Sequence, residues 1–366
     1  MIQFLTCGAL AILFAYQSQF KRNRYLLVFS FVIIAYIMGM QDAISTDFNN
    51  YKEIFNDIIA GKIGHSYLGF NTKEGFEGIE SGWYYLNLAV GSIINSYNVV
   101  ATIAAGIMSF ALYKIVNFSC LKYRWLAVGF FYFIPMLFLM SAIRQGVAVG
   151  LFILVVLYVI ERSWKKAILC VMLGLAFHNS FIFSILFLPI LFIPEDFINK
   201  HKKTITILLI VSYTLTVIFS AQINQFAINY AIENIGNEMS SYEGYFKEAL
   251  RGKLSTIYIL FRYILFCISL VAFWNSSSND RKFILLYIIS SFTIAIMGEN
   301  NNMSRLNYYI SIFAIPCMCL VPLYLKNNIL KYVFLILISY YIFNSFTKAM
   351  DTVYYSRFLE YKTIIF

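Results

Sequence analysis

Residues 141–160 have the sequence SAIRQGVAVGLFILVVLYVI, in which a short polar start precedes an apolar run of transmembrane length. Arg144 stands where that run begins, so a charge marks one edge of the predicted span. The same arrangement, a long apolar segment bounded by isolated polar residues, recurs along the 366-residue chain. Because a segment in the bilayer core must form all its backbone hydrogen bonds internally, we predict an all-α protein that crosses the membrane many times.

The composition supports the same class of protein. Hydrophobic residues make up 60% of the chain, charged residues 13%, and the mean hydropathy is +0.72, which excludes an ordinary soluble domain. The basic cluster at 21–24 follows the first apolar stretch instead of preceding it, so we interpret residues 2–16 as a retained helix and not a signal peptide. The net charge of +10 fits cytoplasmic loops and does not indicate a nucleic-acid partner. The six cysteines lack metal-ligand spacing and predict neither disulfides nor zinc.

The apolar segments predict about 12 transmembrane spans in a single polytopic domain, residues 1–366. They are 2–19, 25–41, 97–117, 125–141, 144–160, 165–178, 180–194, 204–220, 255–274, 282–298, 305–325 and 329–346. Residues 165–194 could also form one bent helix. Segment 81–95 is apolar but has no charged flank on its far side, so we expect it to lie at the outer interface or to re-enter the membrane, without a full crossing.

The loops on the two sides differ in charge. Six loops on one side hold 15 Lys and Arg against four acids, whereas the other side holds 11 against 14 acids. By the positive-inside rule the first side is cytoplasmic and both termini face out. Two outer, periplasmic loops, 42–96 and 221–254, are long enough to contain short helices, and the tail 347–366 is amphipathic and could lie along the interface.

Three arginines interrupt the apolar background. Arg144 could be a snorkelling residue that marks a helix end, or an anion clamp that binds a diphosphate bidentately. Gly146 and Gly150 follow it at the spacing that permits close helix packing. Arg262 lies inside a predicted span, where a charge costs about 3 kcal/mol unless it faces a cavity or a partner. Arg305 follows a polar loop and is either an ordinary flanking charge or a functional one.

The other candidates are a histidine and two carboxylates on the outer side. His178 lies between two apolar segments, where a structural, hydrogen-bonded role competes with that of a base, because histidine titrates near neutral pH. Asp47 and Glu80 bracket the first outer loop, and each has aromatic neighbours that suit sugar binding. The alternative is that these acids only keep the surface of the loop soluble. All these polar groups converge on the outer face, which suggests a site.

The order of these clusters resembles that of the EpsG / Wzy-like family of polysaccharide polymerases. The matching pieces are Asp47-Phe-Asn-Asn-Tyr51 with Phe55, Glu80-Ser-Gly-Trp-Tyr-Tyr-Leu-Asn87, Arg144-Gln145 with Ala148, His178-Asn-Ser180-Phe181, and Arg305 with Tyr308. Trp83 and Phe48 stand where the family often has tyrosine, and both keep the aromatic character. The resemblance covers residues 40–310, and the order of the motifs makes the set more specific than any motif alone.

The resemblance implies a GT-C-like glycosyltransferase of the bacterial inner membrane with its active site facing the periplasm. It would transfer a growing glycan from undecaprenyl diphosphate onto a lipid-linked repeat unit. The resemblance implies no nucleotide sugar, metal or other cofactor. The implied partners are the lipid-linked oligosaccharides, the bilayer and a chain-length regulator protein. We assign His178 as the first candidate for the base, with Glu80 or Asp47 second. The diphosphate-binding candidates are Arg144, Arg262 and Arg305, and the glycan-binding candidates are Tyr51, Trp83, Tyr84, Gln145 and Asn301.

Three other functions compete with a polymerase. A lipid-linked oligosaccharide flippase would have similar spans and arginines, but its polar path should open to both sides of the membrane. An O-antigen ligase-like transferase usually carries a histidine in a larger outer loop, and loop 221–254 contains none. A membrane O-acyltransferase is a weaker alternative, because its histidine and acid usually face the cytoplasm.

Overall fold

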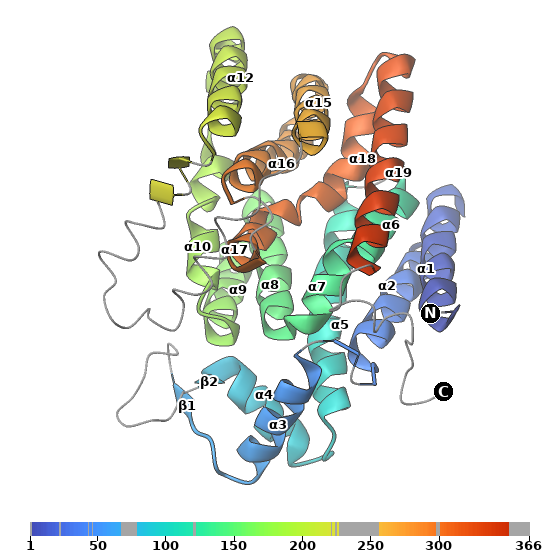
Figure 1. The fold of residues 1–366 in the computed structure, drawn as a ribbon, viewed down its shortest axis with the longest axis vertical. Coiled ribbons are helices and arrows are strands. Elements are labelled where there is room, and N and C mark those ends of the chain that lie inside the picture. Colours follow the sequence, from blue (N-terminus) through green and yellow to red (C-terminus); the bar gives the residue numbers. More distant parts are fainter. Residues whose placement is uncertain are drawn as a thin grey trace. The chain divides into compact units, whose positions relative to one another are not determined.

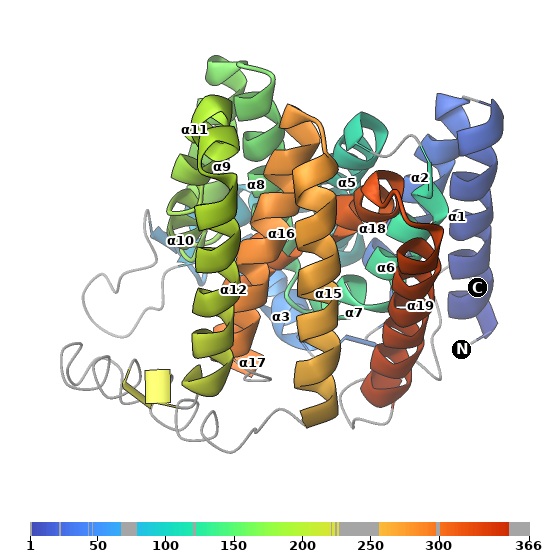
Figure 2. The same cartoon turned by 90° about the horizontal axis from the view of Figure 1, so that it is seen from above.

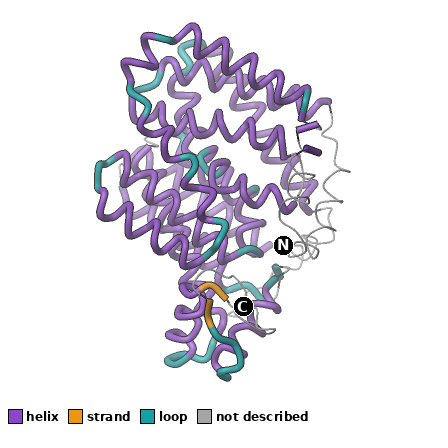
Figure 3. The backbone as a smooth tube through the Cα atoms, turned by 90° about the vertical axis from the view of Figure 1, so that its left-hand side faces the viewer, coloured by secondary structure: helices purple, strands orange, loops and turns teal. Residues whose placement is uncertain are grey.

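The computed structural model describes residues 2–21, 23–42, 44–45, 47–66, 79–119, 122–220, 222–223, 225–226, 256–297 and 301–350. Almost all of this part is helical, which confirms the predicted all-α class (Figure 3). The only strands in these ranges are β1 (His65–Ser66) and β2 (Ile79–Glu80). Contacts divide the chain into two compact units: the first comprises Met1–Leu186 with Ile338–Phe366, and the second comprises Phe187–Leu337.

The first unit is a helical bundle. The helices of the bundle are α1 (Ile2–Lys21), α2 (Arg24–Gly39), α5 (Tyr97–Ser119), α6 (Arg124–Phe133), α7 (Pro135–Ser141), α8 (Ile143–Ile160) and α9 (Trp164–Phe177). Helix α8 packs between α5 and α9 and is buried on nearly all sides, as expected for a helix that is apolar all round. Gly150 allows its close approach to α5, since a Cβ there would lie 3.0 Å from the Met108 Cα, whereas Gly146 faces Leu139 of α7.

A sharp bend separates α6 from α7. Pro135 begins α7, and the two helices meet at 46°. Proline cannot continue the hydrogen-bond ladder of the preceding helix, so the break falls at this residue. At the other end of α7 a single residue, Ala142, separates it from α8, which places Ser141 close to the start of α8.

Four short elements of the first unit gather at one end of the bundle. They are α3 (Phe48–Ile59), β1, β2 and α4 (Ser81–Gly91), and they lie where α2 ends and α5 begins (Figure 1). The strands pair in parallel, with His65 opposite Ile79 and Ser66 opposite Glu80. Helix α4 has 11 residues, too few to cross a bilayer, while the predicted placement of 81–95 at the outer interface stays a prediction.

The second unit surrounds α16 (Ser278–Met297). Its other elements are η1 (Leu188–Phe192), α11 (Glu195–Lys200), α12 (Lys202–Ile218), α15 (Thr256–Asn275), α17 (Asn301–Ser311) and α18 (Ala314–Tyr324). Helices α12 and α15 lie along α16 (Figure 2). Arg281 joins α16 to α11 through an ion pair of 2.6 Å with Glu195 and a hydrogen bond of 3.0 Å to Asn199. Helix α19 (Asn328–Met350) belongs to both units.

The described helices that are long and apolar enough to cross a membrane are fewer than the 12 spans predicted from the sequence. Five of the described helices are long and apolar enough to cross a membrane, or six if the bent α6–α7 pair forms one span. The five are Tyr97–Ser119, Ile143–Ile160, Tyr258–Asn275, Arg305–Tyr324 and Asn328–Lys348. A multi-pass membrane protein is therefore supported, while the count of 12 and the GT-C architecture stay predictions. Residues 227–254 and 351–366, where we expected amphipathic segments, lie outside the described residues.

Residues 165–194 are not one continuous helix. Helix α9 ends at Phe177, α10 (Phe181–Ile185) follows after three residues, and η1 comes next. The interruption falls on His178, Asn179 and Ser180, the polar group noted in the sequence. Polar side chains that hydrogen-bond the local backbone compete with a continuous helix, which accounts for a break at this point.

Candidate active site

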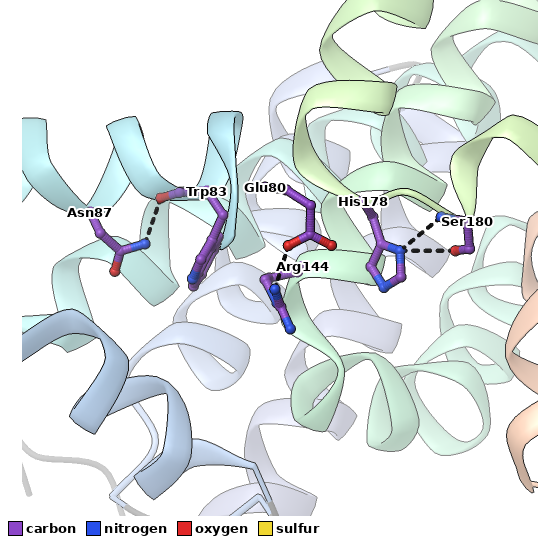
Figure 4. A network of polar contacts seen from close by, with 6 residues as sticks. All are labelled: Glu80, Trp83, Asn87, Arg144, His178 and Ser180. Atoms are coloured by element: carbon purple, nitrogen blue, oxygen red, sulfur yellow. Dashed lines mark hydrogen bonds and ion pairs between the residues drawn. The ribbon is translucent and has the colours of Figure 1, made fainter. Parts of the chain in front are cut away.

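A buried ion pair joins two elements at the end of the first unit that carries α3 and α4. Glu80 precedes the first residue of α4, and Arg144 is the second residue of α8. The guanidinium Nη1 of Arg144 donates to the Glu80 carboxylate, and the two side chains are only 24% and 10% exposed (Figure 4). Each buried charge depends on the other, because removal of one partner would leave the second uncompensated.

Aromatic rings support this pair. The Arg144 guanidinium carbon lies 5.2 Å from the centre of the Tyr51 ring, within the range of a cation–π contact. Tyr51 in turn meets Trp83 edge-on, with ring centres 5.8 Å apart. Trp83 is fully buried and contacts the pair through the Tyr51 ring. The rings hold the guanidinium in one orientation without neutralising its charge.

Helix α4 reaches the end of α9 at unusually close range. A Cβ added at Gly82 would lie 2.8 Å from the carbonyl oxygen of Ala176 and 3.0 Å from the Phe177 ring. Only glycine permits this approach without movement of the backbone. Since Glu80 lies two residues before Gly82 and His178 directly follows Phe177, the contact brings the carboxylate and the histidine to the same region.

His178 lies in the turn between α9 and α10. The Ser180 backbone N–H donates to His178 Nδ1 at 3.2 Å, and the Ser180 hydroxyl lies 2.9 Å from the same nitrogen. The Phe181 N–H donates to the His178 carbonyl at 2.9 Å, which closes the turn. The turn therefore fixes the orientation of the imidazole ring relative to its backbone (Figure 4).

Several buried polar atoms around these elements have no hydrogen-bond partner among the described residues. They are Trp83 Nε1, Asn87 Oδ1, Ser141 Oγ, Arg144 Nε and Asn179 Oδ1. An unsatisfied buried polar group costs about 1–3 kcal/mol, and folded proteins rarely accumulate them. Their concentration on α4, the α7–α8 junction and the α9–α10 turn is the arrangement expected of a site that a polar ligand or ordered water completes.

The remaining candidates of the first unit lie at different distances from the pair. Asp47 precedes α3 and lies one turn before Tyr51, whose N–H donates to the Asp47 carbonyl at 3.0 Å. Gln145 follows Arg144 and is 1% exposed. Tyr84 is partly exposed and packs beside His65, with ring centres 5.3 Å apart. Gln145 thus adjoins the pair in sequence, Asp47 lies one turn from the Tyr51 ring that contacts Arg144, and Tyr84 belongs to a more accessible aromatic group.

The other two arginine candidates belong to the second unit. Arg262 of α15 donates from Nε and Nη2 to the Tyr258 hydroxyl at 2.9 and 2.6 Å, one turn earlier on the same helix. Arg305 is exposed on α17. Asn307 of the same helix forms a hydrogen bond with Thr293 of α16. The side chain of Asn301 lies outside the described residues, so its proposed glycan contact stays a prediction.

A family model matches residues 24–363, which is almost the whole chain. The chain belongs to the EpsG family. The predicted family is thereby confirmed, and the match extends beyond the segment that carries the motifs. No curated protein and no solved structure matches the chain.

The family match indicates the general function of the chain. Its members are polysaccharide polymerase-like membrane proteins associated with glycosyltransferase-like activity. The Glu80–Arg144 pair and the His178 turn lie within the matched residues. The catalytic and binding roles of individual residues stay predictions.

The motif reading missed the residues that position the site. Gly82 and Asn87 stand inside the quoted motif, but their spacing alone does not show that one meets α9 and the other binds the Trp83 carbonyl at 2.7 Å. Asn179 stands inside the quoted His178 motif, and Ser141 stands three residues before Arg144, but no role was assigned to either. A polar residue close to a candidate in the sequence was the available signal for both.

Trp83 tests the packing of this site. We expect Trp83→Ala to lower the free energy of unfolding by about 3–5 kcal/mol, because the ring is fully buried. Trp83→Phe should cost less stability, since Nε1 bonds none of the described residues, yet it should lower activity if a ligand accepts from Nε1. Thermal unfolding in detergent measures the first effect. Trp164→Ala, at a ring that is 48% exposed, is the matched control and should change stability little.

Proposed function

We propose that this EpsG-family protein is a polysaccharide polymerase that transfers a growing glycan from undecaprenyl diphosphate onto a lipid-linked repeat unit. The observation that carries the proposal is the buried Glu80–Arg144 pair with orphaned polar atoms on the surrounding elements. A carboxylate and a guanidinium in one desolvated site are the two groups that such a transfer needs: one to accept a proton, and one to stabilise an anionic leaving group.

The reaction is a substitution at the anomeric carbon of the donor glycan. An acceptor hydroxyl attacks that carbon, the new glycosidic C–O bond forms, and the bond to the lipid diphosphate breaks with its electron pair. The proton of the hydroxyl passes to a general base, for which the candidates are His178, Glu80 and Asp47. The diphosphate leaves with additional negative charge, which cationic groups stabilise without a metal.

Arg144 is the principal diphosphate ligand in this proposal. Its guanidinium lies in the first turn of α8, where the helix dipole already favours an anion and opposes a cation. Glu80 compensates for that cation in the resting site. If the carboxylate takes the proton, the ion pair weakens while the leaving group gains charge, so Arg144 can exchange one anionic partner for another.

The other candidate residues stay part of the proposal. Arg262 and Arg305 are further candidate diphosphate ligands, and the candidates for contact with glycan are Tyr51, Trp83, Tyr84, Gln145 and Asn301. The buried Trp83 ring would reach a glycan only through its Nε1 edge. We place the site at the periplasmic face of the inner membrane, because the loop charge bias assigns the opposite ends of these helices to the cytoplasm. A chain-length regulator would be a partner there.

The glycan ladder of a deletion strain tests the function. Cells that lack the protein should display a single repeat unit at the surface and no longer chains, and the wild-type copy should restore the ladder. This result is expected because a polymerase acts after the repeat unit has crossed the membrane. If instead no unit reaches the surface and lipid-linked precursor accumulates inside, the protein is a flippase and the polymerase proposal fails.

A further inference from the structure

Two tyrosines of α4 and a histidine of β1 form an aromatic cluster. The ring centre of His65 lies 5.3 Å from that of Tyr84 and 5.1 Å from that of Tyr85, and the two tyrosine ring centres are 5.3 Å apart. A hydrogen bond of 3.0 Å joins the Tyr85 hydroxyl and His65 Nε2. The sequence motifs indicate only Tyr84 as a glycan contact, and the structure groups His65 and Tyr85 with it.

Strand pairing fixes the histidine beside the tyrosines. In the parallel pair of β1 and β2, His65 lies opposite Ile79 and Ser66 lies opposite Glu80. Strand β2 leads directly into α4, and α4 contacts β1 (Figure 1). The backbone that positions Glu80 for its ion pair with Arg144 therefore also positions the aromatic cluster.

Helix α4 presents the cluster on its accessible side. Trp83 and Asn87 are fully buried, whereas Tyr85, two positions from each and so nearly opposite them around the helix, is 50% exposed. Tyr84 comes four positions after Glu80, so it lies one helical turn, about 5.4 Å, further along. One sugar unit of a glycan chain has a comparable length. A chain whose reacting sugar lies at Glu80 can thus place its next sugar at the cluster.

The surface chemistry of the cluster suits a sugar ring. The faces of aromatic rings carry partial negative charge, which attracts the C–H groups on the face of a sugar. Tyrosine hydroxyls and the imidazole add hydrogen-bonding groups at the ring edges, where a sugar has its own hydroxyls. Aromatic faces combined with a few placed polar groups are typical of sites that bind and orient a small ligand.

An anchor in the bilayer interface is the alternative role for exposed tyrosines. Such an anchor needs no fixed ring orientation, whereas the hydrogen bond to His65 and the neighbouring rings fix that of Tyr85. The exposed apolar side chains of Ile93 and Ile94 follow the other end of α4 and are better suited to lipid. Because the cluster lies toward the end of α4 that begins next to Glu80, these observations favour a glycan.

We infer that His65, Tyr84 and Tyr85 form a subsite that binds a sugar ring of the lipid-linked glycan, one unit away from the sugar that reacts at the Glu80–Arg144 pair. The inference rests on the proposed polymerase function and deepens it. No bond is made or broken at this subsite, so its loss should weaken substrate binding and leave the chemical step unchanged. Its effect on chain extension should therefore disappear when lipid-linked substrate is saturating.

Substitutions of Tyr85 distinguish a flat ring from simple apolar area. Tyr85→Phe keeps the ring and loses the hydrogen bond to His65, Tyr85→Leu keeps apolar area without the ring, and Tyr85→Ala loses both. The probe is the oligosaccharide that mild acid releases from the strain's own lipid-linked repeat units. Its affinity for each full-length variant in detergent is measured by titration calorimetry. Tyr332→Ala, at an exposed ring of α19, is the matched control and should bind as the wild type does.

We expect Tyr85→Ala and Tyr85→Leu to bind the oligosaccharide about threefold to tenfold more weakly than the wild type, which is the range that one aromatic contact provides. Tyr85→Phe should bind within about twofold of the wild type, since it loses only one exposed hydrogen bond. Wild-type affinity in Tyr85→Ala would overturn the inference. Wild-type affinity in Tyr85→Leu would overturn it too, because apolar area alone would then suffice, as it does in a bilayer anchor.

Chain extension in membranes separates this inference from the proposed function. With limiting lipid-linked substrate, Tyr85→Ala should extend chains about threefold to tenfold more slowly than the wild type, and at saturating substrate equally fast. A wild type that binds the oligosaccharide but extends no chains would contradict the polymerase function and leave the subsite in place. A wild type that extends chains, matched by Tyr85→Ala at every substrate level, would contradict the subsite alone.

Discussion

Arg144→Ala is expected to abolish long glycan chains while single repeat units still reach the lipid carrier. The guanidinium is the group best placed to stabilise the leaving diphosphate, and loss of one such preorganised contact costs about a hundredfold to a thousandfold in rate. The ladder of a complemented deletion strain, at matched protein levels in the membrane, measures the effect. Normal chain lengths in this variant would remove Arg144 from the site.

The stability of this variant needs its own control. Removal of the guanidinium leaves the Glu80 carboxylate buried and unpaired, which should cost about 3 kcal/mol. Adding Glu80→Gln to Arg144→Ala removes the unpaired charge and should recover most of that stability, but not polymerisation. Arg144→Lys keeps the charge and loses the planar fork and the contact with Tyr51, so it should be intermediate in activity.

Gly82→Val is expected to be nearly as damaging, although glycine has no side-chain chemistry. A Cβ at this position would lie 2.8 Å from the Ala176 carbonyl oxygen, so α4 must move away from α9. That movement would carry Glu80 away from Arg144 and from the His178 turn. We predict a loss of polymerisation of about a hundredfold, together with a loss of stability of about 1–3 kcal/mol from overpacking.

A second glycine separates this effect from the general consequences of valine in a membrane protein. Gly106 lies within α5, and a Cβ there would meet nothing within 4 Å. Gly106→Val should therefore insert, fold and polymerise as the wild type does. Chain length in cells and thermal unfolding in detergent are compared for the two variants, and equal behaviour would mean that the α4–α9 contact does not position the site.

Many of the helices can be predicted from the sequence, because a bilayer restricts the structures that an apolar segment can form. Apolar runs of sufficient length must become helices, so α5, α8 and α19 appear close to where the hydropathy pattern predicts them. Charges at the ends of these runs also mark their limits, as Arg144 does for α8. The break after Phe177 is less obvious, since the apolar character continues on both sides of His178.

The sequence by itself determined the helical membrane class, the family and the small set of polar residues that could do chemistry. Tertiary structure decided which of those residues meet. Glu80 and Arg144 are 64 positions apart, and only the packing of α4 on α9 and of α9 on α8 brings elements so distant in sequence to one site. Hydropathy reports the preference of each segment for lipid, which is a local property. The pairing of two buried charges depends on the path of the whole chain, which no local pattern contains.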